Sequence, residues 1–252
     1  MMQNIVIEIR NVKKSFESQH VLKDVTLDLT KGENLVIVGK SGIGKSVLVK
    51  CIVRLLKADS GVIKVLGEYV NALDNDALNE LRKKIGFLFQ GGALYDSMTV
   101  KENLEFPLKR IHRGLKRAEI DQKVKEALEQ VGLLDALNKM PSQLSGGMCK
   151  RISVARTIIV NPQIMLYDEP TAGLDPVTSS EISTLINDVQ KKYNTSSIII
   201  THDIECARIT ANRVIMLEDG TVYKEGSIES FETSRDSLIM SYFNPSSNPT
   251  HY

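Results

Sequence analysis

A glycine-rich loop carries the strongest chemical signal in the sequence. It reads Gly39-Lys40-Ser41-Gly42-Ile43-Gly44-Lys45-Ser46 and matches the phosphate-binding pattern G-x-x-x-x-G-K-[ST]. An apolar run, Leu35–Val38, precedes the loop, and a helical pattern opens at Val47. In that context backbone N–H groups surround phosphate oxygens, Lys45 pairs with the β- and γ-phosphates, and the Ser46 hydroxyl binds Mg²⁺. The alternative is a glycine-rich loop that only turns the chain, but the strand–loop–helix context favours the phosphate site.

Two adjacent carboxylates are the second candidate for chemistry. Asp168 and Glu169 follow the apolar run Ile164–Tyr167, which predicts a buried strand. Because ligands of open α/β sheets lie beyond the carboxyl ends of the strands, we expect Asp168 near Ser46, where it supports the metal. Glu169 points differently and is expected to activate a water molecule as a general base. A strand that ends in Asp-Glu is common by itself; coupled to the phosphate loop, it indicates a nucleotide site.

Alternating patterns predict the elements that position these groups. Residues 3–38 are predicted to be rich in strands, because the side chains alternate at Ile5–Arg10 and Val25–Leu29 as in half-buried strands, whereas the unbroken apolar run Leu35–Val38 suits a strand covered on both faces. From about 91 to 163 the apolar spacing becomes helical, and another helix is expected at 178–192. Further strand signals fall at 61–66, 85–89, 164–167, 197–200 and 213–216. Strands that alternate with helices predict a mostly parallel α/β sheet, into which the helical stretch is inserted.

The composition argues against several classes of protein. The 252 residues include 32 Lys and Arg against 31 Asp and Glu, a net charge of +1, and this balance argues against nucleic acid as a partner. No apolar run approaches the roughly 20 residues that cross a bilayer, and the first residues do not resemble a secretory signal. The scattered Cys51, Cys149 and Cys206 suggest no zinc or disulfide framework and favour a reduced, cytosolic compartment.

A third motif points to a family. Leu144-Ser145-Gly146-Gly147-Met148 resembles the LSGGQ signature of the ABC (ATP-binding cassette) ATPases, although Met148 stands where glutamine is usual and Cys149 where a longer polar residue is common. Four more segments fall in the order of that family. They are Phe16, similar to the aromatic residue that stacks on adenine; Gln90, similar to the glutamine that joins the core to the helical subdomain; the loop Ala172–Asp175, similar to the loop that contacts the opposite subunit although Gly173 departs from the usual residue; and His202, similar to the switch histidine.

The resemblance covers about residues 3 to 227 and implies a fold. This is a P-loop NTPase of the ABC type, with a mostly parallel core sheet, an N-terminal antiparallel β subdomain and an inserted helical subdomain. A single ABC ATPase domain would then fill residues 1–252. Its parts would be a nucleotide-binding core (1–90 and 164–228), a helical subdomain with the signature (91–163), and a C-terminal extension (229–252) whose end we expect to be disordered.

The resemblance also implies ATP and Mg²⁺ as ligands and a head-to-tail homodimer, with ATP between the phosphate loop of one subunit and the signature of the other. The implied catalytic residues are Lys45, Gln90, Glu169 and His202, and the implied metal-binding residues are Ser46, Gln90 and Asp168. The implied ATP-binding residues are Phe16, Gly39, Lys40, Ser41, Gly42, Ile43, Gly44, Lys45, Ser46 and Val47, with Ser145, Gly146, Gly147 and Asp175 acting across the dimer interface.

The segment after Gln90 suggests which kind of cassette this is. Residues 89–108 resemble the ATPases of the bacterial Mla/MCE-linked lipid transporters. That resemblance implies phospholipid transport across the cell envelope, a peripheral location on the cytoplasmic face of the bacterial inner membrane, integral-membrane permease subunits that dock near Gln90–Val100, and an MCE-type lipid-binding protein in the complex. The alternatives are the ATPase of another importer or exporter, for amino acids or lipoprotein release, and a soluble cassette in metal-cluster assembly, DNA repair or cell-division signalling.

Two apolar groups suggest contact surfaces. Leu94, Tyr95 and Met98 are expected to form a patch beside Gln90 that receives a helix of a membrane subunit; the alternative is that they fill the core of the helical subdomain. In the C-terminal extension, an apolar helical face is expected to dock on the cassette or on its dimer mate. Its members are Phe231, Leu238, Ile239, Tyr242 and Phe243.

Overall fold

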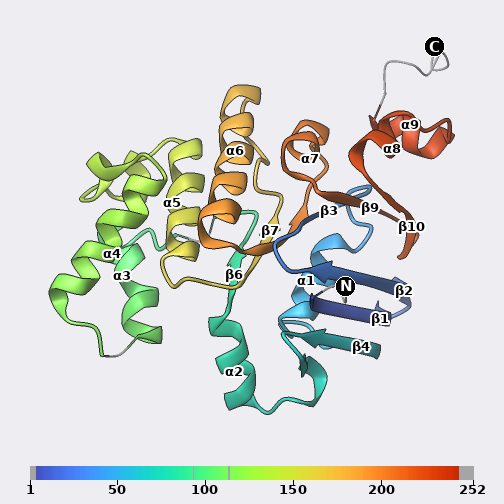
Figure 1. The fold of residues 1–252 in the computed structure, drawn as a ribbon, viewed down its shortest axis with the longest axis horizontal. Coiled ribbons are helices and arrows are strands. Elements are labelled where there is room, and N and C mark those ends of the chain that lie inside the picture. Colours follow the sequence, from blue (N-terminus) through green and yellow to red (C-terminus); the bar gives the residue numbers. More distant parts are fainter. Residues whose placement is uncertain (1–3, 93, 113, 244–252) are drawn as a thin grey trace. The chain divides into compact units, whose positions relative to one another are not determined.

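The computed structural model describes residues 4–92, 94–112 and 114–243, which fall in two compact units (Figure 1). The first unit comprises residues 1–71 and 198–252, and the second comprises residues 72–197. The end of the chain that was expected to be disordered, residues 244–252, lies outside the described residues, as does Ala93 of the expected docking segment.

Long antiparallel strands build one part of the first unit. Strand β1 (Ile5–Phe16) pairs with β2 (Gln19–Thr30) on one side and with β4 (Ser60–Val65) on the other, and β5 (Glu68–Tyr69) follows β4. Burial alternates along β1 as the sequence predicts, because Ile9 and its cross-strand partners all face the core.

Parallel pairing begins at a strand that is buried along its whole length. Strand β3 (Asn34–Val38) lies parallel to β9 (Arg213–Glu218), which forms a hairpin with β10 (Thr221–Gly226). Such a strand has no polar face, which explains its unbroken apolar run. The helices α1 (Lys45–Ile52) and α7 (Ile204–Thr210) belong to this unit. Strand β8 (Ser196–Ile200) spans the division between the two units.

Two short helices end the described chain. In α8 (Ile228–Glu232) and α9 (Ser237–Phe243), the side chains of Phe231, Ile239 and Phe243 are buried. The Phe231 and Phe243 rings lie 5.3 Å apart. The expected apolar face of the extension therefore packs within the first unit of its own chain.

The second unit is mainly helical and contains one parallel strand pair. Strands β6 (Ile85–Leu88) and β7 (Ile164–Asp168) pair in register, from Ile85 opposite Ile164 to Leu88 opposite Tyr167. Its helices are α2 (Asn75–Lys83), α3 (Val100–Ile111), α4 (Arg117–Gln130), α5 (Gly146–Ile158) and α6 (Pro176–Tyr193).

Side-chain caps set where these helices begin. Asp74 caps α2, Thr99 and Glu102 form a capping box on α3, and Asp175 caps α6. The helix predicted at 178–192 is α6, extended at both ends by this cap and by the left-handed Asn194. Within the described residues, none of the helices combines the length and apolarity that crossing a bilayer demands.

Candidate nucleotide site

Only glycine fits at two positions of the phosphate loop. Gly39 has a φ of +148°, and a Cβ on it would lie 2.6 Å from the Leu217 carbonyl oxygen at the end of β9. Gly44 has a φ of +105°, and a Cβ there would meet side-chain atoms of Val21 and Leu22 at 2.8 and 2.9 Å. The pattern of glycines is therefore imposed both by backbone conformation and by close packing against β2 and β9.

Lys45 opens α1 and folds back over the loop. Its side chain is buried, and Nζ donates to the carbonyl oxygens of Gly39 at 2.6 Å and Lys40 at 3.0 Å. The N-cap residue of α1 is Gly44, which offers no side-chain acceptor to the first N–H groups of the helix. An ammonium group beside the N-terminus of a helix forms an anion cradle, so these residues fit the phosphates of ATP.

The other predicted residues of the first unit, apart from Phe16, either belong to this loop and the start of α1 or follow the carboxyl end of a strand. Lys40, Ser41 and Gly42 are exposed, and Ile43, Ser46 and Val47 are half-buried. His202 is exposed and follows β8, where a 3.3 Å hydrogen bond from Thr201 N to Ile37 O joins the residue before it to β3. The histidine and the loop thus both follow the carboxyl ends of strands within one unit.

Phe16 lies apart from the loop in sequence, at the far end of β1. Its ring is exposed, and Lys14 Nζ stands 5.3 Å from the ring centroid. An exposed aromatic face is available for stacking, as the prediction for adenine requires.

The carboxylate pair belongs to the second unit. Asp168 is buried at the end of β7, and Glu169 adopts a φ of +52°, which is uncommon for a residue with a side chain. Such strained backbone costs about 1 kcal/mol or more and persists only where the surroundings impose it. The backbone therefore changes direction at Glu169, directly after the end of β7.

The signature begins α5. Ser145 caps the helix by accepting a 3.3 Å hydrogen bond from Met148 N, and Ser145 and Gly146 are exposed. A Cβ on Gly147 would lie 2.5 Å from Thr178 Cγ2, so close packing against α6 requires a glycine there. An exposed helix start suits the predicted contact across a dimer interface.

Asp175 has a structural task in this chain. Its Oδ1 accepts from the backbone N–H groups of Val177 and Thr178, and its Oδ2 accepts from the Thr178 hydroxyl at 2.6 Å. These bonds, above all those from Thr178, hold the pKa of Asp175 below its usual range. The predicted nucleotide contact of Asp175 would therefore be made by a carboxylate that also caps α6.

Gln90 follows β6 and is exposed. Its backbone carbonyl is bonded by Lys150, a residue that the sequence motifs did not identify. The Gln90 carbonyl accepts a hydrogen bond from Lys150 Nζ on α5. Burial lowers the pKa of Lys150, while the charges of Asp168 and Glu169 act in the opposite sense. The available signal was helical spacing, because Lys150 shares a face with the fully buried Val154 and Ile158.

The residues predicted to bind Mg²⁺ differ from those of a metal site built by protein side chains alone. No cluster of three or more His, Cys, Asp or Glu side chains suited to a metal exists among the residues that the structure describes. The predicted set is Ser46, in the first unit, with Gln90 and Asp168, in the second. One carboxylate and two neutral groups suit Mg²⁺, which keeps most of its ligands as water and substrate phosphates.

A groove beside Gln90 lies entirely within the second unit. It has a volume of about 390 Å³, and its lining includes Phe87, Phe89, Tyr95, Pro107 and Arg156. The Arg156 guanidinium stands 4.7 Å from the Tyr95 ring centroid. Asn103 is buried beneath and holds the turn through Tyr95 N at 2.8 Å and the carbonyl oxygens of Tyr95 and Met98. Tyr95 is exposed while Leu94 and Met98 are half-buried.

Loop, carboxylates and signature together define a nucleotide-binding cassette, and comparisons with known proteins agree. Residues 22–172 match the ABC transporter family, and the chain belongs to this family of ATPases. It is 38% identical over 223 residues to the methionine import ATP-binding protein MetN of Brucella abortus (strain 2308), covering 88% of this chain and 60% of the relative. It is 38% identical over 244 residues to the probable ribonucleotide transport ATP-binding protein mkl of Mycobacterium leprae (strain TN), covering 97% and 70%.

Solved structures support the same fold. The cassette MJ0796, in a dimeric post-hydrolysis state bound to ADP and Pi, matches with a TM-score of 0.81 and 35% identity over 88% of this chain and 98% of that one. The structure of cbiO1 from Clostridium perfringens, part of the ABC transporter complex cbiONQ, matches with a TM-score of 0.84 and 28% identity over 97% of each chain.

These findings confirm the predicted ABC ATPase class, the mixed α/β fold and the ligands ATP and Mg²⁺ of that class. The finer resemblance to Mla/MCE-linked lipid transporters is not supported by the relatives, among which methionine import ATPases recur, and neither is an MCE-type partner. The chain spans about 60% of the length of the MetN relatives from Brucella.

Proposed function

We propose that this chain is the ATP-hydrolysing subunit of a membrane transporter. The observation that carries the proposal is the buried Lys45 at the start of α1, whose Nζ donates to the carbonyl oxygens of a loop in which Gly39 and Gly44 have positive φ and no room for a Cβ. The proposed division of labour follows the sequence, with a core of residues 1–90 and 164–228, a helical subdomain of residues 91–163 and an extension from 229.

The proposed roles assign one task to each polar group. Lys45 neutralises the phosphates, and Ser46 with Asp168 and Gln90 holds Mg²⁺, which stabilises charge on the phosphates when bound. Glu169 orients and deprotonates the attacking water, and His202 steadies the γ-phosphate. Phe16 stacks on the adenine, and the remaining loop residues supply backbone N–H groups.

The exposed signature supports a homodimer in which each subunit completes the site of the other. We expect Glu169→Gln to bind ATP and to pair into stable dimers, because the phosphates persist where hydrolysis would remove them. Light scattering with ATP and Mg²⁺, compared with ADP, measures the pairing, and phosphate release measures turnover. Normal hydrolysis by this variant, or no ATP-dependent pairing, would contradict the assignment.

The groove beside Gln90 is the proposed docking site of a permease subunit. Its aromatic walls and the Arg156 cation suit a short amphipathic helix that carries a carboxylate. Tyr95→Glu should abolish co-purification with the permease while leaving ATP hydrolysis by the free cassette intact. Tyr69→Glu, which changes an exposed tyrosine of the first unit, is the matched control.

The relatives favour import of a small organic solute such as an amino acid over phospholipid transport. Phospholipid transport remains a second candidate because of the resemblance in the segment 89–108. The relatives are not limited to methionine importers, since mkl, whose alignment covers 97% of this chain, is named as a probable ribonucleotide transport protein. Reconstitution of the cassette with its permease in liposomes separates the two. ATP-dependent uptake of a labelled amino acid supports import, and ATP-dependent extraction of labelled phospholipid supports the other candidate.

A further inference from the structure

Lys150 is a buried cation that the nucleotide motifs do not explain. It lies in the second turn of α5, behind the signature, and only 8% of it is exposed. A lysine is seldom buried unless its charge is compensated. Its hydrogen-bond acceptor, the Gln90 carbonyl, is neutral, so the compensation must come from elsewhere.

That compensation comes from the end of β7. The charges of Asp168 and Glu169 both favour the protonated form of Lys150 and oppose the effect of burial. Two adjacent carboxylates repel each other, and one of them, Asp168, is itself buried. The charge of Lys150 and the charges of both carboxylates therefore act on one another within the same unit.

The turn after β6 approaches α5 closely at a second point. Gly92 has a φ of +77°, and a Cβ on it would come within 2.9 Å of the Ser153 hydroxyl on α5. Its N–H donates to Phe89 O at 2.9 Å, which closes the turn around Gln90. Lys150 thus bonds to this short segment at Gln90, and Ser153, about one helical turn further along α5, packs closely against its glycine.

We propose that Lys150 is a positioning residue that connects three parts of the second unit: the signature helix, the backbone of Gln90 and the carboxylates Asp168 and Glu169. It holds Gln90 through its hydrogen bond and orients the carboxylates through its charge. A displacement of α5 is thereby transmitted to both. This inference rests on the proposed ATPase function and adds a residue to it.

The test compares substitutions that separate charge from hydrogen bonding. Lys150→Met removes both, Lys150→Gln keeps a donor without the charge, and Lys150→Arg keeps both. We expect Lys150→Met to lower kcat by about tenfold or more with the KM for ATP changed less than about threefold, and Lys150→Arg to recover most of kcat. Lys150→Gln should fall between them.

Arg151→Met is the matched control, since Arg151 is the next cation on α5 and pairs with Glu181 at 2.7 Å. Its kcat should equal that of the wild type. Because Lys150 acts partly through Gln90, the double variant Gln90→Ala/Lys150→Met should lose less than the product of the two single losses.

The outcomes separate this inference from the proposed function. A wild-type chain without ATP hydrolysis defeats the proposed function. An active wild type whose Lys150→Met variant keeps full kcat, or whose Lys150→Arg variant is as impaired as Lys150→Met while thermal unfolding shows both folded, overturns the role of Lys150. If Lys150→Met does not fold, equal kcat in Lys150→Gln and Lys150→Arg overturns the role of the charge.

Discussion

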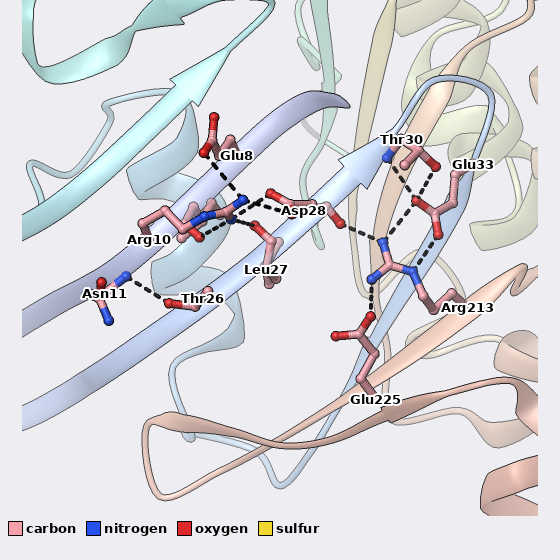
Figure 2. A network of polar contacts seen from close by, with 11 residues as sticks. Glu8, Arg10, Asn11, Thr26, Leu27, Asp28, Thr30, Glu33, Arg213 and Glu225 are labelled. Carbon is pink, nitrogen blue, oxygen red and sulfur yellow. Dashed lines mark hydrogen bonds and ion pairs between the residues drawn. The ribbon is translucent and has the colours of Figure 1, made fainter. Parts of the chain in front are cut away.

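Two networks, one in each unit, are built around a half-buried or buried charge, and the two central charges have opposite signs. In the first unit Arg213 is a cation enclosed by Glu33 and Glu225 (Figure 2). In the second unit Glu105 is an anion enclosed by Lys109 and Arg117, with Lys101 further away. The cation joins strands and a turn, whereas the anion lies between α3 and α4.

The two networks differ in the rigidity of their partners. Arg213 binds Glu33 through two hydrogen bonds of 2.6 and 3.0 Å and also donates to Asp28 O at 2.6 Å, so its plane is fixed on three sides. The side chains of Arg213 and Glu33 are only 23% and 11% exposed. Around Glu105, which is 5% exposed, the Lys109 and Arg117 side chains are 54% and 58% exposed. Long exposed side chains are hydrated and weakly held. Each ion pair around Glu105 should therefore stabilise the second unit less than an ion pair of Arg213 stabilises the first.

Arg213→Met gives the largest expected effect. It leaves the Glu33 carboxylate mostly buried without its bidentate partner, and we expect the free energy of unfolding to fall by about 3 kcal/mol. Urea unfolding measures the loss. Arg10→Met is the control from the same network, because Arg10 and Asp28 are about one-third exposed and their pair should contribute less than about 1 kcal/mol. Equal losses in the two variants would show that burial does not rank these pairs.

Acid should weaken the first network by titrating Glu33. Burial alone would raise the pKa of Glu33, but hydrogen bonds from Arg213 and Thr30 hold it below the ordinary value of 4.5. A lowered pKa means that the contribution is fully present above pH 4.5 and is lost as the pH falls through the value in the folded state. Urea midpoints of the wild type and Glu33→Gln should therefore converge as the pH falls from 6 to about 3. Parallel pH profiles would contradict this origin of the stability.

Glu105→Gln tests the second network. The glutamine amide has the same size as the Glu105 carboxylate and leaves no buried charge. Only the attraction between Glu105 and its exposed cations is lost, so we expect the free energy of unfolding to decrease by about 1 to 2 kcal/mol. The comparison with Arg213→Met is made at the same salt concentration, since added salt should reduce the Glu105 effect more. A loss larger than that of Arg213→Met would reverse the ranking of the two units.

Local signals allowed much of the site and fold to be predicted. The phosphate loop is encoded by neighbouring residues, and its glycines occupy positions that the structure confirms as sterically closed, Gly39 and Gly44. The alternation of β1 and the apolar run of β3 likewise report burial that each strand experiences along its own length. Patterns of this kind need no knowledge of distant partners.

Contacts between distant residues could not be predicted in this way. Arg213 and Glu33 are separated by 180 residues, and the bond from Lys150 to Gln90 spans 60. Helical spacing can place Lys150 on a buried face, but it does not identify the partner of either cation, because a charged residue looks the same in the sequence whether its partner is water or a remote polar group. The left-handed backbone of Glu169 could not be predicted from the sequence either, since glutamate is not a residue type that favours positive φ.

The smallest expected effect concerns the capping box at the start of α3, the helix that carries Glu105. The Thr99 hydroxyl accepts a 3.2 Å hydrogen bond from Glu102 N and donates to the Glu102 carboxylate at 2.8 Å, and that carboxylate also accepts from Thr99 N at 2.7 Å. Thr99→Ala removes the hydroxyl and should lower the unfolding free energy by about 1 kcal/mol, with little dependence on salt, because the group that is lost carries no charge. Thr99→Ser, which keeps that acceptor, is the control. If Thr99→Ala and Glu105→Gln shared one salt dependence, helix fraying, and not the charge of Glu105, would account for both, and the contrast between the two networks would reduce to the stability of a single helix end.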